Sequence, residues 1–255
     1  MKTIQAFFLL LLFSLPFGVQ SQANMTTTSE SSTLRAGENR VTFQSGGESI
    51  VGTLFLPDGF REGSALTTVI ISGPWTQVKE QVGYRYAEAL RQRGLAALAI
   101  DHRYWGESGG TPRALESGAA KVEDLRNAIT FLSTLPAINA EDINLVGVCA
   151  GAGTTAQVVA QDIRVAGYAT VAAWLQHPST TPLFYGGDEG VAALIAKGEA
   201  AEATYANTGE MPYVAAYDPA EGSGAAMSFP SEYYGRADRG AVPSWTNQFA
   251  VTSWK

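Results

Sequence analysis

The sequence has little material for cross-links or metal ligation, because its 255 residues include one cysteine, Cys149, and two histidines, His102 and His177. A lone cysteine cannot form a disulfide within its own chain, so a disulfide-stapled fold is excluded. Without a second cysteine or a Cys/His cluster, thiol–disulfide exchange and metal binding are weak hypotheses. We therefore expect no cofactor and no metal. Cys149 is either a buried small apolar residue or a reactive thiol.

Positive charge is also scarce. The chain has 17 basic and 24 acidic residues, a net charge of −7 at neutral pH, and no basic stripe along any segment. Such a balance disfavours polyanionic partners, so we expect no nucleic acid among the partners of this protein.

Long hydrophobic runs are missing as well. The apolar run at residues 6–13 is too short to span a bilayer comfortably. Lys2 precedes it, and Pro16 and Gly18 follow it, so we interpret residues 1–23 as a cleaved secretory signal peptide, with an uncleaved anchor as the alternative. The protein is then exported, periplasmic or secreted, without a membrane partner after cleavage. The sequence leaves its oligomeric state open.

After a Ser/Thr/Asn-rich leader at residues 24–39, short apolar runs alternate with helical patterns over residues 40–173. Strands are expected at 41–43, 50–56, 69–72, 96–100, 143–148 and 165–171, and helices at 80–93, 119–132 and 153–161. This rhythm predicts an α/β fold with a mainly parallel sheet and helices on both faces. Residues 174–243, with a helix at 190–205, read as a cap-like insertion, and residues 244–255 as a segment returning toward the sheet.

Active sites of such sheets lie at the carboxyl ends of the strands, and one strand ends in Gly-Val-Cys-Ala-Gly at residues 147–151. A Gly-x-nucleophile-x-Gly turn between strand and helix lifts its central side chain above the sheet. It also places the N–H of Ala150 beside Cys149, and the helix N-terminus favours a thiolate. The alternative is a glycine-rich turn around an inert, buried cysteine.

A second strand end is followed by Ser-Gly-Pro-Trp-Thr at residues 72–76. Where a nucleophile stands on such a turn, this loop supplies the other N–H of the oxyanion hole. Pro74 has no N–H, so the donor is Trp75 or, alternatively, Thr76. An ordinary Gly-Pro turn is the competing interpretation.

The third loop, DHRYWGESGG at residues 101–110, resembles the D-x-R-G-x-G-x-S-x-G loop of many α/β-hydrolases. SGPWTQVKEQ at 72–81 and GVCAGAG at 147–153 are similar to motifs of a bacterial subgroup related to dienelactone hydrolases and X-Pro dipeptidyl-peptidase-like enzymes. The resemblance covers about residues 40–255. It implies that Asp101 and Arg103 brace their loop, and that His102 is a loop residue and not the catalytic base.

In α/β-hydrolases the catalytic residues follow the order nucleophile, acid, histidine. His102 precedes the elbow, and His177 comes before any strand that could carry the acid. The resemblance places acid and base on strands that would follow Lys255. We therefore expect a C-terminally truncated product, a fragment or a degenerate member. Such a chain would expose a sheet edge and be poorly stable or prone to aggregate.

Two functions remain. The first is hydrolysis of an ester, lactone or related small carbonyl compound, with Cys149 as nucleophile and the amides of Ala150 and Trp75, or Thr76, holding the oxyanion. The second is an exported, non-catalytic binding protein that has lost its acid and histidine. The substrate is not determined by the sequence. Several tyrosines could line a pocket or serve ordinary packing: Tyr185, Tyr205, Tyr213, Tyr217, Tyr233 and Tyr234.

Overall fold

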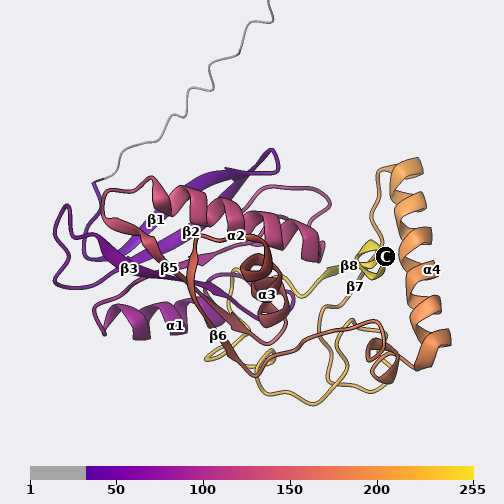
Figure 1. Cartoon of the computed structure of the whole chain (residues 1–255). Coiled ribbons are helices and arrows are strands. Elements are labelled where there is room, and N and C mark those ends of the chain that lie inside the picture. The colour runs from indigo at the N-terminus through magenta and orange to yellow at the C-terminus, as the bar shows by residue number, and fades with distance from the viewer. Residues whose placement is uncertain (1–32) are drawn as a thin grey trace, which may run out of the picture. The chain divides into compact units, whose positions relative to one another are not determined.

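The computed structural model describes residues 33–255, so the predicted signal peptide and most of the predicted leader lie outside the described residues. The described chain is built on a six-stranded sheet of order β1-β2-β4-β3-β5-β6 (Figure 1). The first two junctions are antiparallel and the other three are parallel. The strands are β1 (Gly37–Ser45), β2 (Glu48–Leu56), β3 (Leu66–Ser72), β4 (Ala96–Ile100), β5 (Ile138–Val148) and β6 (Val165–Val171).

Helices cover both faces of this sheet (Figure 1). On one face, α2 (Gly118–Ser133) and α3 (Gly151–Gln161) bury a large apolar cluster that includes Leu125 and Ile129. On the other face, α1 (Val82–Arg91) packs Ala87 against a smaller cluster around Phe55 and Ile71. The predicted α/β architecture is confirmed, because the apolar positions at helical spacing in α2 are the ones it buries.

The strands at 96–100 and 165–171 have the predicted bounds, whereas others are longer. β1 begins at Gly37, inside the predicted leader, because Gly37 already pairs with Leu56. β5 begins at Ile138, before the predicted start at residue 143, because Ile138 pairs with Leu66 across a register shift. Backbone pairing therefore extends strands beyond the runs in which apolar residues mark them.

Residues 174–255 contain η1 (Thr181–Leu183), α4 (Gly187–Thr208), β7 (Tyr213–Val214), β8 (Phe249–Ala250) and η2 (Val251–Trp254). β8 pairs antiparallel with β7 in a separate two-stranded sheet, and η2 packs along α4. The predicted return segment is thus tied to β7 and α4, and the Ala250 N–H also donates to the Ala114 carbonyl (2.9 Å). Within residues 33–255, no helix combines the length and apolarity that crossing a membrane requires.

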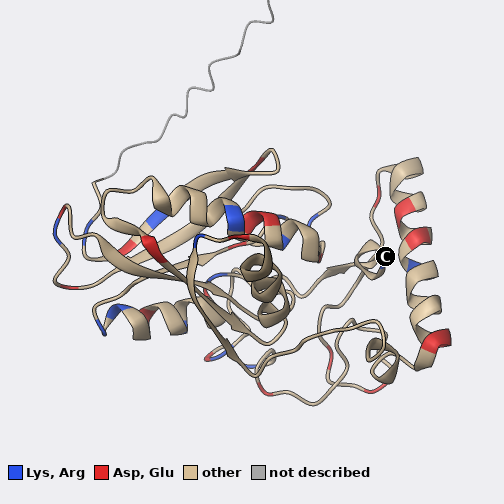
Figure 2. Ribbon diagram, viewed as in Figure 1, with Lys and Arg blue, Asp and Glu red and all other residues tan. Residues whose placement is uncertain are grey.

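β6 is an edge strand of the sheet, and its side chains are exposed on both faces. Tyr168 and Val171 are 41% and 39% exposed, and Ile163, just before the strand, is fully exposed. The strand VAGYATV has neither a charge nor a proline, and its ribbon is tan in Figure 2, where charged residues are blue or red. The exposed apolar sheet edge expected from the sequence is therefore present, and such edges promote association between chains.

Replacing Ala169, an exposed residue in the middle of β6, by lysine should reduce self-association. A charge on an edge strand opposes pairing with the same edge of another chain. Light scattering during slow heating measures the effect, with Ala206→Lys on the exposed side of α4 as the charge-matched control. Equal scattering from both variants, or reversible two-state unfolding of the parent chain at a high midpoint, would contradict the expectation.

Candidate active site

Cys149 lies in a tight turn between β5 and α3, with φ of +54°. Positive φ is uncommon outside glycine and marks backbone strain, which often accompanies a functional position. Both backbone groups of Cys149 are fixed: its N–H donates to the Val171 carbonyl, and its carbonyl accepts from the N–H groups of Ala152 and Trp174, each at 3.0 Å. This is the backbone that a nucleophile elbow requires.

The small residues around Cys149 are dictated by contact with backbone. A Cβ on Gly147 would lie 2.5 Å from the Cα of Ala152, and a Cβ on Gly151 would lie 2.1 Å from the carbonyl oxygen of Ser72. The N-terminus of α3 therefore lies directly against the end of β3. Gly153 is less constrained, because its nearest neighbour would be 3.4 Å away.

The loop at residues 72–76 lies beside the elbow because β3 and β5 are parallel neighbours in which Ser72 pairs with Gly147. Thr76 in this loop is fully buried and has φ of +61°. That conformation costs a β-branched residue about 1–3 kcal/mol. Both of its backbone groups are engaged: the N–H donates to Glu116 Oε2 (3.3 Å), and the carbonyl accepts from Trp245 Nε1 (2.6 Å).

The three amides predicted to hold an oxyanion differ in whether their N–H groups already have a hydrogen-bond acceptor. Among residues 33–255, neither Ala150 nor Trp75 has an acceptor for its N–H, whereas the Thr76 N–H is bonded to Glu116. Ala150 precedes α3, so its N–H adds to the unpaired donors of that helix terminus. Of the two alternatives in the loop, the Trp75 amide is therefore the one available to a ligand in this structure.

An aromatic cluster from the C-terminal part of the chain packs beside the two loops. Its buried members Tyr217, Met227 and Tyr234 contact Trp75 and Trp245. Burial raises the pKa of Tyr234, and the charge of Cys149 raises it further. Two of the tyrosines identified in the sequence thus belong to this cluster.

Trp75 is held by rings as well as by its loop. The ring centroid of Trp75 lies 5.0 Å from that of Phe249 and 5.6 Å from that of Trp254. Both pairs have the edge-to-face geometry that stabilises contacts between aromatic rings. The predicted return segment therefore packs on the loop at residues 72–76.

Asp101 braces the third loop from within. Its carboxylate accepts from Lys79 Nζ (2.7 Å) and from the N–H groups of Lys79 (2.8 Å) and Glu107 (2.9 Å). Its carbonyl accepts from Ser108 Oγ (2.6 Å). Burial lowers the pKa of Lys79, but the charge of Asp101 and hydrogen bonds to Asp101, Glu107 and Glu80 outweigh it and raise that pKa.

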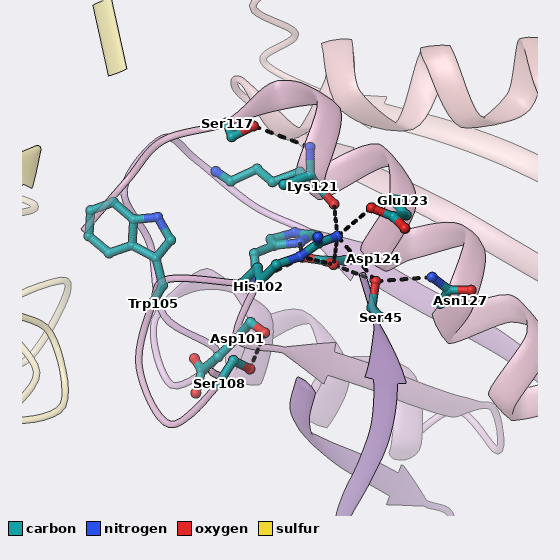
Figure 3. Close-up of polar contacts among 12 residues, drawn as sticks. Ser45, Asp101, His102, Trp105, Ser108, Ser117, Lys121, Glu123, Asp124 and Asn127 are labelled. Atoms are coloured by element: carbon teal, nitrogen blue, oxygen red, sulfur yellow. Dashed lines mark hydrogen bonds and ion pairs between the residues drawn. The ribbon is translucent and has the colours of Figure 1, made fainter. Parts of the chain in front are cut away.

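Arg103 forms a second brace, with its acidic partners Glu123 and Asp124 on α2 (Figure 3). Its guanidinium donates to Asp124 Oδ1 (2.8 Å) and Glu123 Oε2 (2.7 Å), and Ser45 Oγ also donates to Asp124 Oδ1 (2.6 Å). His102 is 2% exposed, with Nδ1 3.6 Å from Asp124 Oδ2. Although serine, aspartate and histidine meet here, the aspartate stands between the other two, whereas a catalytic triad places histidine there.

His177 also lies apart from the elbow. It is exposed, its Nδ1 is 2.8 Å from Ser179 Oγ, and it lines a surface pocket of about 300 Å³ together with Gln176, Pro178, Thr181, Pro182, Asp188 and Val191. Within residues 33–255, neither histidine is hydrogen-bonded to Cys149. The structure thus brings the turn of Cys149 and Ala150 against the loop that carries Trp75, and neither histidine contacts Cys149 by a hydrogen bond within the described residues.

Three carboxylates that sequence reasoning did not group come close together: ligand atoms of Glu80, Asp101 and Glu107 lie within 4.8 Å of one another. Carboxylates so arranged can hold a divalent cation. Here Lys79 Nζ lies 2.7–2.8 Å from an oxygen of each of them. The ammonium therefore takes the position that a metal ion would need.

No family model matches the chain. The Pseudomonas aeruginosa protein PA2218 is 40% identical over 119 residues, which are 47% of this chain and 32% of that protein. A thiohydrolase of Aspergillus aculeatus is 34% identical over 119 residues, 47% of this chain and 36% of that protein. The matched segments thus span less than half the length of these curated relatives.

Structural comparison covers more of the chain. The crystal structure of PA2218 superimposes with a TM-score of 0.73 at 30% identity, covering 85% of this chain and 69% of that one. The α/β hydrolase GrgF from Penicillium superimposes with a TM-score of 0.70 at 22% identity, covering 85% and 71%. Sheet and elbow together define an α/β-hydrolase fold, the fold of GrgF. With 30% identity over 69% of PA2218, the chain belongs to the family of PA2218.

Because Arg103 binds the buried Asp124 carboxylate, the free energy of unfolding should depend on pH in the acid range. Burial by itself raises the pKa of Asp124, but the nearby His102 ring and hydrogen bonds from Ser45 Oγ and the Arg103 N–H outweigh it and lower the pKa from 3.8 to about 2. A depressed pKa contributes stability above the ordinary value that is lost as pH falls through the folded value. The unfolding free energy should therefore drop by about 2 kcal/mol between pH about 4 and 2.

Urea denaturation across this pH range measures the Asp124 contribution. In Asp124→Asn the acid-dependent step should shrink, and stability at neutral pH should fall by about 3 kcal/mol because Arg103 loses a buried partner. The control is Asp58→Asn, which changes an exposed carboxylate. An undiminished acid step in Asp124→Asn would show that the brace has no such role.

Gly151→Ala should destabilise the fold by about 2–3 kcal/mol, because the added methyl group would overlap the Ser72 carbonyl oxygen. Gly153→Ala is the matched control in the same helix. Its methyl group meets its first neighbour at 3.4 Å, and alanine favours the helix by up to about 1 kcal/mol. Chemical denaturation of both variants tests the close approach, which would be refuted by equal stabilities.

Proposed function

We propose that the chain acts on the carbonyl carbon of a small ester, lactone or related compound, with Cys149 as the nucleophile. The observation that carries this proposal is the strained turn at Cys149, beside two amides from neighbouring strand ends that have no acceptor among residues 33–255. An inert buried cysteine needs neither positive φ nor unpaired donors next to it. The strain is consistent with a reactive position held by its surroundings.

In the proposed reaction, the Cys149 thiolate attacks the carbonyl carbon, and the carbonyl oxygen becomes an oxyanion that accepts hydrogen bonds from the N–H groups of Ala150 and Trp75. Collapse of this intermediate expels the alkoxide leaving group and forms a thioester to Cys149. Water then hydrolyses that thioester and returns the thiol. The proposal assigns the nucleophile to Cys149 and the oxyanion donors to the two amides; among residues 33–255, neither histidine is hydrogen-bonded to Cys149.

The relatives extend the range of candidate substrates. One of them is named a thiohydrolase, so acyl groups carried on sulfur join esters and lactones as candidates. The relation to dienelactone hydrolases and X-Pro dipeptidyl-peptidase-like enzymes, drawn from three loop motifs, stays a prediction. So do export of the protein and the absence of nucleic-acid and membrane partners.

The second candidate is a non-catalytic binding protein. The observation in its favour is that His102 is committed to the Asp124 cluster and His177 to the outer pocket, so neither contacts the thiol. In that case the aromatic cluster beside Cys149 would bind a ligand without turning it over.

The two candidates differ in the reactivity of the thiol. Because Cys149 is the sole cysteine, alkylation by iodoacetamide reports on it alone. For a nucleophile we expect alkylation of the native chain at least as fast as of the chain in urea. We also expect the acetyl group of 4-nitrophenyl acetate to be transferred to Cys149. Intact-mass spectrometry measures this transfer.

Cys149→Ala is the control, and it should lose both modifications while keeping the circular dichroism spectrum of the parent. If iodoacetamide alkylates the native chain about 100-fold more slowly than the chain in urea, and no acetyl transfer occurs, the thiol is buried. That result would refute the hydrolase proposal in favour of the binding protein.

A further inference from the structure

The left-handed backbone conformation of Thr76 is not explained by its own side chain. Thr76 is β-branched, fully buried and in a left-handed conformation, next to the residue that offers its N–H to the oxyanion. Its Oγ1 has no hydrogen-bond partner in the described part of the chain, so the side chain does not hold the backbone in place. The conformation must be imposed by what its peptide groups contact.

Glu116 supplies one of these contacts from the start of α2. Its Oε2 accepts from the Thr76 N–H (3.3 Å), and its Oε1 pairs with Lys121 Nζ. The side chains of Glu116 and Lys121 are only 9% and 8% exposed. The backbone of Glu116 is also fixed, because its N–H donates to Ser253 Oγ (2.9 Å) and Ser117 after it caps α2. The carboxylate is therefore a rigid acceptor.

We propose that Glu116 is a positioning residue of the oxyanion loop, residues 72–76. Its carboxylate fixes the Thr76 peptide so that the N–H of Trp75, and not that of Thr76, donates a hydrogen bond to the substrate oxygen. The inference rests on the proposed function. Without the carboxylate, the peptide between Trp75 and Thr76 is free to rotate toward an ordinary conformation. That rotation moves Trp75, whose amide must point at the oxyanion and not at the ground-state carbonyl.

The effect can be separated from thiol reactivity. Alkylation of Cys149 by iodoacetamide forms no oxyanion, whereas acetylation by 4-nitrophenyl acetate passes through one. The ratio of the two rate constants for the same protein therefore reports the oxyanion loop and cancels changes in thiol ionisation. Both reactions use the full chain at alkaline pH, where the thiol is ionised without a base.

Two double variants isolate the hydrogen bond to Thr76. Glu116→Met with Lys121→Met removes the buried charge pair together, at similar volume, and leaves no charge unpaired. Glu116→Gln with Lys121→Met differs from it only in keeping an acceptor for the Thr76 N–H. We expect the ratio to fall about 10- to 100-fold in the first variant and to stay within about 3-fold of the parent in the second.

Glu202→Met with Lys255→Met removes a different, exposed pair and should keep the parent ratio. An unchanged ratio in the Glu116→Met double variant overturns the inference. A raised ratio also overturns it, because Glu116 would then be blocking the Thr76 amide. Failure of the parent chain to acetylate at all counts against the proposed function itself, a result these ratios keep distinct. If the Glu116→Met double variant does not fold, Glu116→Leu with Lys121→Leu removes the same acceptor and the same charge pair, and an unchanged ratio there overturns the inference equally.

Discussion

The contact of Gly151 with the backbone of Ser72 and Gly73 is the constraint on which the site depends. No side chain separates the N-terminus of α3 from the end of β3. The turn that carries Cys149 and the loop that carries Trp75 are therefore in direct backbone contact. Any larger residue at position 151 would push the two loops apart. The spacing between the Cys149 turn and the amides of the neighbouring loop is thus set by backbone packing, which is stiffer than contact through side chains.

Around this contact, buried ion pairs fix loops that carry no regular structure of their own. Lys79 and Asp101 hold one loop, Arg103 and Asp124 hold it again from the side of α2, and Glu116 accepts from the Thr76 N–H in the loop that carries Trp75. Buried pairs of this kind often add little net stability, since desolvation opposes their attraction. Their directed hydrogen bonds instead select a single conformation, and a site made of backbone amides requires that.

Sequence periodicity located most of the elements because each strand and helix buries an apolar face against the sheet. The strand at 96–100, with five buried residues in succession, has the predicted bounds. β1 and β5 start earlier than predicted, because pairing partners and not apolar content decide where a ladder ends. The elbow was equally visible, since glycines that contact backbone cannot be replaced by larger residues. Glu116 carried no such signal: forty residues separate it in sequence from the peptide it contacts.

The sequence by itself determined the α/β architecture, the place of Cys149 at a strand end and the presence of three loops at the same edge of the sheet. These follow from local patterns, namely period, small residues and turn chemistry. Only the tertiary structure decided which amides are free. The Trp75 N–H has no acceptor among residues 33–255, while the neighbouring Thr76 N–H is taken by Glu116. It also decided that His102 and His177 lie outside the site. Hydrogen-bond partners distant in sequence settle such questions, and a linear pattern does not encode them.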